Sequence, residues 1–491
     1  MERVTYKEQE TVLLQNFEMN IMEGEIVGLL PGNNSFGLSD LLNILRYNTP
    51  LYYGYVYYME KKVNSWQDMR RTNNKISIIE SKSSLVKGQT VATNIFVLRP
   101  EFHQEIIPFR LLREQLQPFL DEIGISIRPE TLVEKLSSFE RVVVEIIRAV
   151  VAGHHLIVLC EISTIVNENR SEDLYRIICY YANKGFSFLY ISFHFEEILQ
   201  ICNRALWMSN GKISMMLDGR DMHNEIAKDY SKRYRSHVIQ RLRDQKEYEK
   251  KDVIAEIKNN RGMYLKGANI QIYRGECLAI QSLDGKVYEE LVSILTGAEE
   301  NRVERIWLNG KSMNPIKTRK IAILQEQPGN SMLFHEMSYM DNLCFTIDHR
   351  MSNIWRNKKI KDSIRREYTE MLGEDVFNKS INELTNTQKI DLIFARIILQ
   401  KPEILICIQP YKGADLSQRI HIWERQKHCL KRGITIVMLV VNMADSLSIA
   451  DRVIRIGKNM KMQEYSKKNF GSLPLSVPWS DLYNHEKDDS E

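Results

Sequence analysis

The hydrophobic and polar positions of the chain alternate between short apolar runs and longer segments with helical spacing. Four continuous apolar runs stand out, at Leu156 to Leu159, Phe188 to Ile191, Ile404 to Ile408 and Ile434 to Val441. Runs of this length between helical stretches are typical of buried parallel strands joined by crossover helices. The pattern therefore predicts an α/β fold with mostly parallel sheets.

The second half of the sequence repeats the first at an offset of about 250 residues. The repeated pairs are Gly24-Glu25 with Gly275-Glu276, Leu136-Ser137 with Leu384-Thr385, and Asn203-Arg204 with Asp451-Arg452. A chain of 491 residues is long enough for each half to bury a core of its own. We therefore expect two copies of one domain.

The repeat and the charge pattern divide the chain into four expected segments. These are a first domain at 1–218, a charged linker at 219–258, a second domain at 259–468 and a polar tail at 469–491. Basic and acidic residues interleave in the linker, which indicates a solvated helix. The same interleaving disfavours the alternative, a basic arm for nucleic acid or anionic lipid.

Composition excludes several classes of protein. The chain is 43% hydrophobic and 26% charged, as in ordinary globular proteins, and no apolar run approaches the roughly 18 residues of a membrane-spanning helix. The first residues lack the apolar core of a signal peptide, and the seven cysteines show no C-x-x-C pair, which favours a reducing cytoplasm. A net charge of +4 gives no support to a nucleic-acid partner.

A glycine-spaced loop follows the first predicted strand. It matches the phosphate-binding pattern G-x-x-x-x-G-K-[ST] except that Leu38 stands at the lysine position. In that pattern backbone N–H groups hold phosphate, the lysine reaches the β- and γ-phosphates, and the hydroxyl binds magnesium. The candidate nucleotide-binding residues are Gly32, Asn33, Asn34, Gly37, Leu38 and Ser39, with Ser39 also the candidate magnesium ligand.

Further motifs follow this loop in a specific order. They are Thr90 to Phe96 after the position of a Q-loop, Leu136 to Glu140 at a signature position, Leu159-Cys160-Glu161 at a Walker B position, and Tyr190 to Ile198 at a switch-histidine position. In this order the motifs resemble the tandem ATP-binding cassette (ABC) subunits of bacterial carbohydrate importers of the ribose, galactose and xylose type, over nearly the whole chain. The resemblance implies two tandem P-loop NTPase domains, each with a mostly parallel sheet and a helical subdomain.

The resemblance also implies functional residues, partners and a location. The signature residues would be Leu136 and Ser137 in the first copy and Leu384 and Thr385 in the second, and Asp415 would lie in a D-loop. Such cassettes bind two ATP molecules, each between one domain's P-loop and the other domain's signature. The implied partners are two membrane permease subunits and, indirectly, a sugar-binding protein. The chain would then be cytoplasmic and peripheral on the inner face of the cell membrane.

The first copy departs from the family pattern at most of its chemical positions. The lysine, Q-loop glutamine, signature glycine, Walker B aspartate and switch histidine positions hold Leu38, Ser81, Phe139, Cys160 and Phe193. Glu161 remains as a candidate catalytic base, although a carboxyl at the end of a buried strand can also be purely structural. His194 is one residue late, which should turn its side chain to the other face. Phe139 either blocks the closing of the opposite P-loop or packs in the core, and packing is favoured.

The second copy departs further. Tyr288 and Glu289 stand at the positions of the basic residue and the hydroxyl, with Lys286 two positions early. Gln409 replaces the Walker B glutamate, and Val441 occupies the switch position. Acidic side chains in this loop would repel phosphate. ATP and Mg²⁺ are therefore candidate cofactors of the first site only.

Two functions compete on this sequence. The first is an ATP-binding subunit of a sugar importer with weak or no ATP hydrolysis, because each lost catalytic group costs on the order of 10² to 10³ in rate. The second is a pseudo-ATPase scaffold or regulatory subunit that relays sugar occupancy without transport, since interaction surfaces can outlast a catalytic site. A third reading, a cytosolic tandem cassette that acts on ribosomes, requires intact Walker residues and is disfavoured.

Overall fold

The structure is a computed structural model that divides into two compact units, with the division near residue 235. It describes residues 1–8, 10–32, 36–67, 73–97, 108–166, 168–219, 252–259, 264–265, 267–282, 285–297, 305–313, 318–346, 354–457 and 461–473. Most of the expected linker and most of the expected tail lie outside these ranges. None of the helices within them is both long and apolar enough to cross a bilayer.

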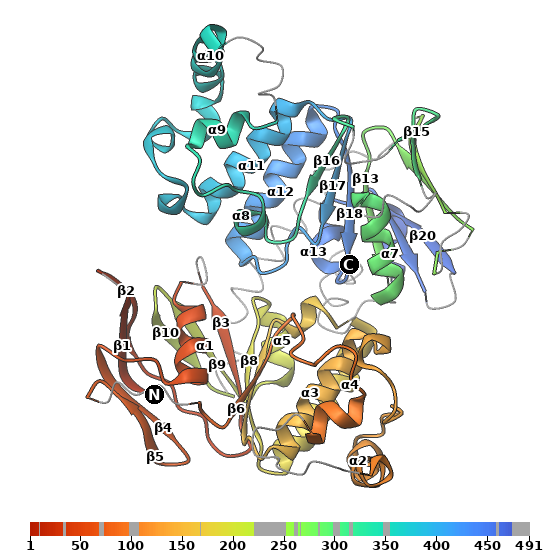
Figure 1. The fold of residues 1–491 in the computed structure, drawn as a ribbon. Helices are drawn as coiled ribbons and strands as arrows, with labels where there is room; N and C mark the ends of the chain where they lie inside the picture. The colour runs from red at the N-terminus through yellow and green to blue at the C-terminus, as the bar shows by residue number, and fades with distance from the viewer. Residues whose placement is uncertain are drawn as a thin grey trace, which may run out of the picture. The chain divides into compact units, whose positions relative to one another are not determined.

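The first unit is built on a six-stranded sheet (Figure 1). Its strands, in spatial order, are β10 (Lys212–Leu217), β9 (Arg204–Ser209), β3 (Ile26–Pro31), β8 (Ser187–Ile191), β7 (Leu156–Cys160) and β6 (Ile76–Ile79). All neighbours are parallel except β10 and β9. The apolar runs at 156–159 and 188–191 are thus adjacent parallel strands, as the sequence predicts.

A second, antiparallel sheet and a set of helices complete the first unit. The antiparallel strands are β2 (Thr11–Phe17), β1 (Glu2–Glu8), β4 (Tyr53–Tyr58) and β5 (Lys61–Ser65). The α-helices are α1 (Leu38–Tyr47), α2 (Phe109–Ile123), α3 (Ser138–Val151), α4 (Glu168–Asn183) and α5 (Phe195–Ile201). In Figure 1 the antiparallel sheet lies at one end of this unit and α2 at the other.

The second unit repeats this architecture. Its six-stranded sheet has the order β20 (Met462–Ser466), β19 (Arg452–Ile456), β13 (Cys277–Ser282), β18 (Thr435–Val440), β17 (Ile404–Ile408) and β16 (Ile321–Leu324). Its antiparallel sheet has the order β12 (Ala268–Tyr273), β11 (Val253–Asn259), β14 (Arg305–Leu308) and β15 (Lys311–Met313). The two units therefore share one strand order, and β3, β7 and β8 correspond to β13, β17 and β18.

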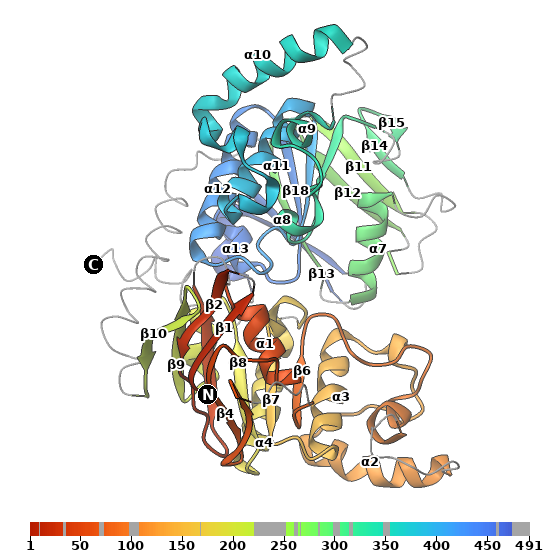
Figure 2. The ribbon, with the colours of Figure 1, turned by 60° about the vertical axis from the view of Figure 1, so that its left-hand side comes forward.

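The helices of the second unit are seen best in Figure 2. They are α7 (Gly285–Thr296), α8 (Pro328–Ser331), α9 (Tyr339–Cys344), α10 (Ile354–Leu372), α11 (Asn386–Gln400), α12 (Leu416–Lys431) and α13 (Ala444–Leu447), with a 3₁₀ segment at Lys467–Ser472. Strand β11 pairs with β12 and β14. The range expected to be linker, 219–258, therefore ends in a strand of the second unit, and the 3₁₀ segment extends into the expected tail.

Apolar side chains cover both faces of each parallel sheet. In β7, Ile157 and Leu159 face one core cluster, and Val158 between them faces the other. The first cluster contains residues of α2, α3 and α4, whereas the second contains residues of α1 and the antiparallel sheet. A strand buried on both faces is continuously apolar, which is why these runs could be recognised from the sequence.

Candidate functional site

Two glycines shape the loop between β3 and α1. Gly37 adopts φ 79° as the N-cap of α1, and a Cβ there would lie 2.4 Å from the backbone oxygen of Leu13. The N–H of Gly32 donates to the backbone oxygen of Met208 at 2.6 Å. A Cβ at Gly32 would lie 2.7 Å from the same oxygen, so packing requires both glycines of the predicted cradle. Asn33 and Asn34 lie outside the described residues.

The side chain at the lysine position points into the protein. Leu38 is 8% exposed and packs in the core cluster with Leu41 and Leu42. Ser39, the next residue, is exposed, and its hydroxyl donates to Oδ2 of Asp40 at 3.4 Å. Burial, and after it the charge of Glu8, raise the pKa of Asp40. Among the described residues 36–40 the helix start therefore carries no cation and one carboxyl group.

The residue after the Walker B strand has the same backbone in both units. Glu161 follows β7 with φ 52°, and its N–H donates to the oxygen of Ile191 at 2.9 Å. Gln409 follows β17 with φ 41°, and its N–H donates to the oxygen of Leu439 at 2.9 Å. The structure thus keeps the position of the predicted catalytic residue and changes only its side chain.

Cys160 replaces the carboxylate that would precede Glu161. Burial, followed by the charges of Glu161 and Glu80, raises the pKa of the Cys160 thiol far above the ordinary value. The thiol is therefore neutral at any physiological pH. A neutral thiol is a poor ligand for magnesium, which prefers oxygen.

The polar side chains at the switch position of the first unit contact one another. Ser192 donates to Oε2 of Glu197 at 2.8 Å, and Nδ1 of His194 lies 3.8 Å from Oε1 of the same carboxylate. Phe193, at the histidine position itself, is buried. His194, one residue late in the sequence, is buried as well, and its imidazole lies against Glu197.

The loop of the second unit is much shorter than that of the first. Six residues separate β3 from α1, whereas two separate β13 from α7, which begins at Gly285. Residues 285–289, which the sequence places in the cradle, instead form the start of the helix. The N–H groups of a longer loop between strand and helix make a phosphate cradle. In the second unit the first turn of α7 takes the place of that loop.

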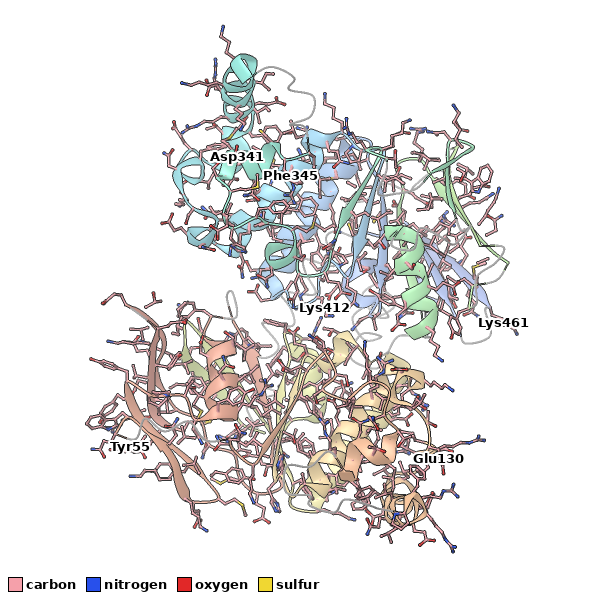
Figure 3. The ribbon with its side chains drawn as sticks, viewed as in Figure 1. Tyr55, Glu130, Asp341, Phe345, Lys412 and Lys461 are labelled. Atoms are coloured by element: carbon pink, nitrogen blue, oxygen red, sulfur yellow. The ribbon has the colours of Figure 1, made fainter. Side chains whose placement is uncertain are left out.

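A network of side chains occupies the Walker B end of the second unit. Nε2 of Gln409 donates to the Tyr288 hydroxyl at 3.0 Å and to Oε1 of Glu326 at 3.1 Å. The Tyr288 hydroxyl in turn donates to Oε1 of Glu326 at 3.4 Å. Lys412, labelled in Figure 3, donates to Oε2 of Glu326 at 2.8 Å. We call Tyr288, Glu326, Gln409 and Lys412 the substitute network, because it joins the residues at the predicted lysine and Walker B positions to one another.

Both signature motifs start helices. Ser137 is the N-cap of α3 and forms a capping box with Glu140, and Thr385 does the same for α11 with Gln388. Leu136 and Leu384, which precede them, are buried. The predicted signature residues thus have a structural role that needs no nucleotide.

Phe139 packs within the first unit. It is 4% exposed and belongs to the core cluster of α2, α3 and α4. The guanidinium of Arg170 lies 4.8 Å from the centre of its ring. This geometry favours packing over a blocking role for Phe139.

The predicted D-loop residue is also a helix cap. Asp415 is buried, and its side chain accepts a hydrogen bond of 2.9 Å from the N–H of Gln418 in the first turn of α12. Gly413, two residues earlier, has φ 70°. The turn that leads into α12 is therefore fixed by a glycine and a cap.

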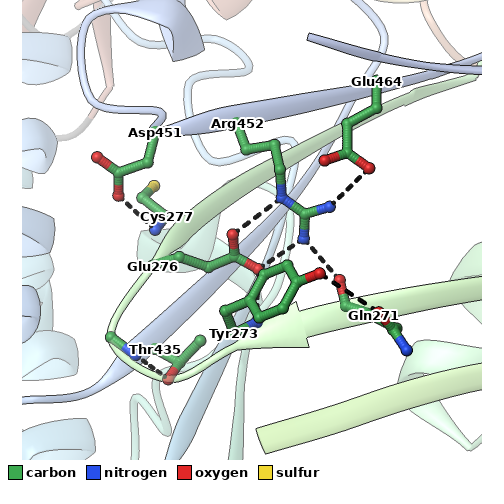
Figure 4. A network of polar contacts seen from close by, with 9 residues as sticks. Gln271, Tyr273, Glu276, Cys277, Thr435, Asp451, Arg452 and Glu464 are labelled. Atoms are coloured by element: carbon green, nitrogen blue, oxygen red, sulfur yellow. Dashed lines mark hydrogen bonds and ion pairs between the residues drawn. The ribbon is translucent and has the colours of Figure 1, made fainter. Parts of the chain in front are cut away.

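Sequence reasoning missed one pair of residues that both units keep. Nε of Arg204 lies 2.7 Å from Oε1 of Glu25, and Nη2 of Arg452 lies 2.8 Å from Oε1 of Glu276. Figure 4 shows the second of these ion pairs. These residues belong to the repeated pairs of the sequence, and that recurrence could have identified them as structural partners.

Comparisons with known proteins agree with this geometry. The profile of the ABC transporter family matches residues 14–164. The ribose import ATP-binding protein RbsA of Clostridium perfringens (strain SM101 / Type A) is 26% identical over 94% of this chain and 95% of its own length. The xylose import ATP-binding protein XylG of Moorella thermoacetica is 23% identical over 95% of this chain and 96% of its own length.

Solved structures with two cassettes share the fold. An RNase-L inhibitor structure has a TM-score of 0.52 at 16% identity and covers 93% of this chain and 88% of its own. A model of ribosome-bound archaeal Pelota and ABCE1 has a TM-score of 0.57 at 13% identity, and the match covers 92% of this chain and 76% of the other. At these identities the likeness concerns the fold, and it shows two tandem cassettes.

Proposed function

We propose that this chain, a tandem ABC-type cassette protein related to sugar-import ATP-binding proteins, is the ATP-binding subunit of a sugar importer that hydrolyses ATP weakly or not at all. The relatives named above span nearly the same length as this chain. Their names support ATP as the nucleotide and sugar as the transported substrate class. Import of a sugar across a membrane in turn implies membrane permease subunits as the docking partners. On this proposal the chain is peripheral to the membrane.

The substitute network carries the proposal of impaired hydrolysis. Glu326, Gln409 and the Tyr288 hydroxyl satisfy one another in the second unit. A nucleotide would have to break these hydrogen bonds and would gain no cradle in return. The residues of the second site therefore do not fit ATP and magnesium.

The first site fits a nucleotide only in part. Gly32 and Gly37 keep the two glycine positions of a phosphate loop, and Ser39 and Glu161 keep an oxygen ligand and a carboxylate. Leu38 and Cys160 remove the cation and the second carboxylate. Loss of the charge-assisted bonds of a lysine costs roughly 1.5 to 3 kcal/mol, so weak binding with little turnover follows.

A pseudo-ATPase scaffold is the second candidate function. The ion pairs Glu25–Arg204 and Glu276–Arg452 and both capped signature helices are kept, whereas the residues that would contact phosphate are replaced. This contrast favours a fold retained for its contacts with a partner. Such a subunit would relay sugar occupancy without driving transport.

Nucleotide titration tests the binding part of the proposal. The full chain should bind no more than one ATP, with little gain from magnesium because Cys160 offers no charged ligand. A chain that binds two MgATP tightly would contradict it. Capture of the full chain by candidate permease subunits tests the docking part, and recovery of ribosomes instead of permeases would exclude it.

A further inference from the structure

The starts of the parallel strands in the second unit form one continuous edge. Glu403 donates from its N–H to the oxygen of Lys320, and the oxygen of Glu403 accepts from the N–H of Thr435. The backbone oxygen of Glu276 accepts from the N–H of Ile436, and the backbone oxygen of Cys277 accepts from the N–H of Asp451. These bonds join β16, β17, β18, β13 and β19 at their first residues. Strand β20 ends at this edge, since Ser466 pairs with Arg452.

Basic side chains occur beside almost every strand along this edge. We call them the basic rim; they are Arg274, Arg319, Lys320, Lys401, Lys431, Arg432, Lys467 and Lys468. All are exposed except Lys467, which is half-buried. The carboxyl ends of α11 and α12 also lie here, and their partial negative charge is offset by Lys401 and Lys431. The other six basic side chains are not needed to offset the charge of these two helix ends.

Acidic groups at the edge are few and mostly engaged. Glu403 contacts Lys320 at 2.6 Å and Arg274 at 3.9 Å. In Figure 4 Glu276 is bonded to Arg452, and Asp451 accepts from the N–H of Cys277. Glu276 is fully buried. Of the described carboxylates at this edge, Asp252 and Glu464 are exposed, and Glu464 lies 3.2 Å from Arg452. Basic groups still outnumber acidic ones, so the rim carries an excess of positive charge toward solvent.

The first unit provides an internal control because the described part of the same edge lacks this excess of positive charge. Its strand starts and the end of β10 carry Lys75 and Lys184 against Glu23 and Asp218, and Lys184 is bound to Glu122 at 2.8 Å. The difference extends to the whole units. Residues 1–219 hold 22 basic and 26 acidic residues, whereas residues 252–473 hold 34 and 26. The shared fold therefore does not explain the rim.

We propose that the basic rim docks on the anionic phospholipid headgroups of a membrane surface. Six strand ends at a spacing of about 4.8 Å make a row roughly 24 Å long, which suits an extended anionic surface better than one small anion. Lysine and arginine near such a surface add attraction residue by residue. This inference does not depend on nucleotide chemistry, although it agrees with a peripheral membrane role.

Single-stranded nucleic acid is another extended polyanion, and the rim suits it less well. Recognition of single strands uses aromatic rings on which bases stack. The exposed aromatic residues in the described part of the second unit are Trp307, Phe334 and Phe345, and none of them belongs to the rim. Lipid headgroups need no such rings.

Co-sedimentation of the full chain with vesicles tests the proposal. The chain should bind vesicles that contain phosphatidylglycerol, should not bind vesicles of phosphatidylcholine alone, and should dissociate as salt rises. Neutralising Arg319→Gln, Lys431→Gln and Lys468→Gln together should weaken binding at least about tenfold. The matched control, Lys311→Gln with Lys358→Gln and Lys359→Gln, removes the same charge from exposed positions outside the rim and should bind like the wild type.

Three results would overturn the proposal. They are equal binding to both kinds of vesicle, no binding to anionic vesicles, and equal losses in the rim and control variants. Rim-dependent binding to RNA without binding to vesicles would assign the rim to nucleic acid instead. Circular dichroism identifies a variant that fails to fold, and the lipid and salt dependence of the wild type then decides the question. Because the vesicles contain no permease, failure here leaves the transport proposal standing.

Discussion

Nε2 of Gln409 lies 3.0 Å from the hydroxyl oxygen of Tyr288, across 121 positions of sequence. The sequence aligns these residues with Glu161 and Leu38 of the first unit, so a hydrogen bond joins the two positions where the family pattern expects a carboxylate and a lysine. Burial, and after it the charge of Glu326, raise the pKa of Tyr288 and keep its hydroxyl protonated. The protonated hydroxyl can therefore accept from Gln409 and donate to Glu326 at the same time.

Restoring the glutamate in the second unit should harm the protein. Gln409→Glu places a second carboxylate within about 3 Å of Glu326 and removes two donated hydrogen bonds. We expect the free energy of unfolding to fall by about 1–3 kcal/mol, as measured by urea denaturation, with no gain in ATP hydrolysis. Tyr288→Phe is the control, since it removes one hydroxyl without adding charge and should cost about 1 kcal/mol. A more stable or an active Gln409→Glu variant would refute the substitute network.

Restoring the lysine in the first unit should also fail. Leu38→Lys moves an ammonium group into the cluster of Leu41 and Leu42, and we expect a loss of about 2–4 kcal/mol in unfolding free energy. Leu38→Met keeps the volume and should cost less than about 1.5 kcal/mol. Because Cys160 and Phe193 remain, phosphate release from MgATP should stay at background. A Leu38→Lys chain that folds well and turns over ATP would show that the lysine alone was missing.

The pKa of Asp451 predicts a pH-dependent stability. Burial raises it to about 6, against the opposing hydrogen bond from the N–H of Cys277, whereas an unfolded aspartate titrates near 4. Between these values the folded state binds a proton that the unfolded state has lost, so stability falls as pH rises. Above pH 6 the charged Asp451 lowers the free energy of unfolding by roughly 2–3 kcal/mol, and this loss disappears below about pH 4.

Asp451→Asn isolates this effect, and the first unit supplies the precedent. There Asn203 accepts from the N–H of Ile26 at 2.8 Å, as Asp451 does from Cys277. The variant should be about 2–3 kcal/mol more stable than the wild type at pH 7 and equal to it near pH 4 in urea denaturation. An advantage that is the same at both values would rule out the titration.

The ion pairs Glu276–Arg452 and Glu25–Arg204 should contribute strongly to the stability of the two units. Arg452→Met leaves Glu276 charged and buried, and should cost about 3–5 kcal/mol. Adding Glu276→Gln removes that charge and should recover part of the loss. Arg204→Met should cost less, because its pair with Glu25 is more exposed. Equal losses in the single and double Arg452 variants, by urea denaturation, would contradict this account.

The sequence was sufficient for the fold because the relevant pattern is local. Continuous apolar runs identified β7, β8, β17 and β18 as buried parallel strands, and the paired ladders confirm their adjacency. Short-range spacing also located Ser137 and Thr385, whose helix starts depend on residues three positions away. The repeat predicts that both units share one strand order, and they do.

The site was less accessible to sequence reasoning, for two physical reasons. Contacts of the substitute network span 38 to 121 positions, and no local pattern reports them. The early start of α7 was missed because Gly285 resembles the loop glycine of a cradle, although a strand and a helix only two residues apart leave no room for one. The burial of Leu38 likewise depends on the antiparallel sheet that packs over α1.

Phosphate release from MgATP by the purified full chain tests the central claim most directly. The account predicts a rate no higher than that of the Glu161→Gln variant, because the cation and the second carboxylate of the first unit and the cradle of the second are gone. A magnesium-dependent rate well above background that Glu161→Gln abolishes would contradict it.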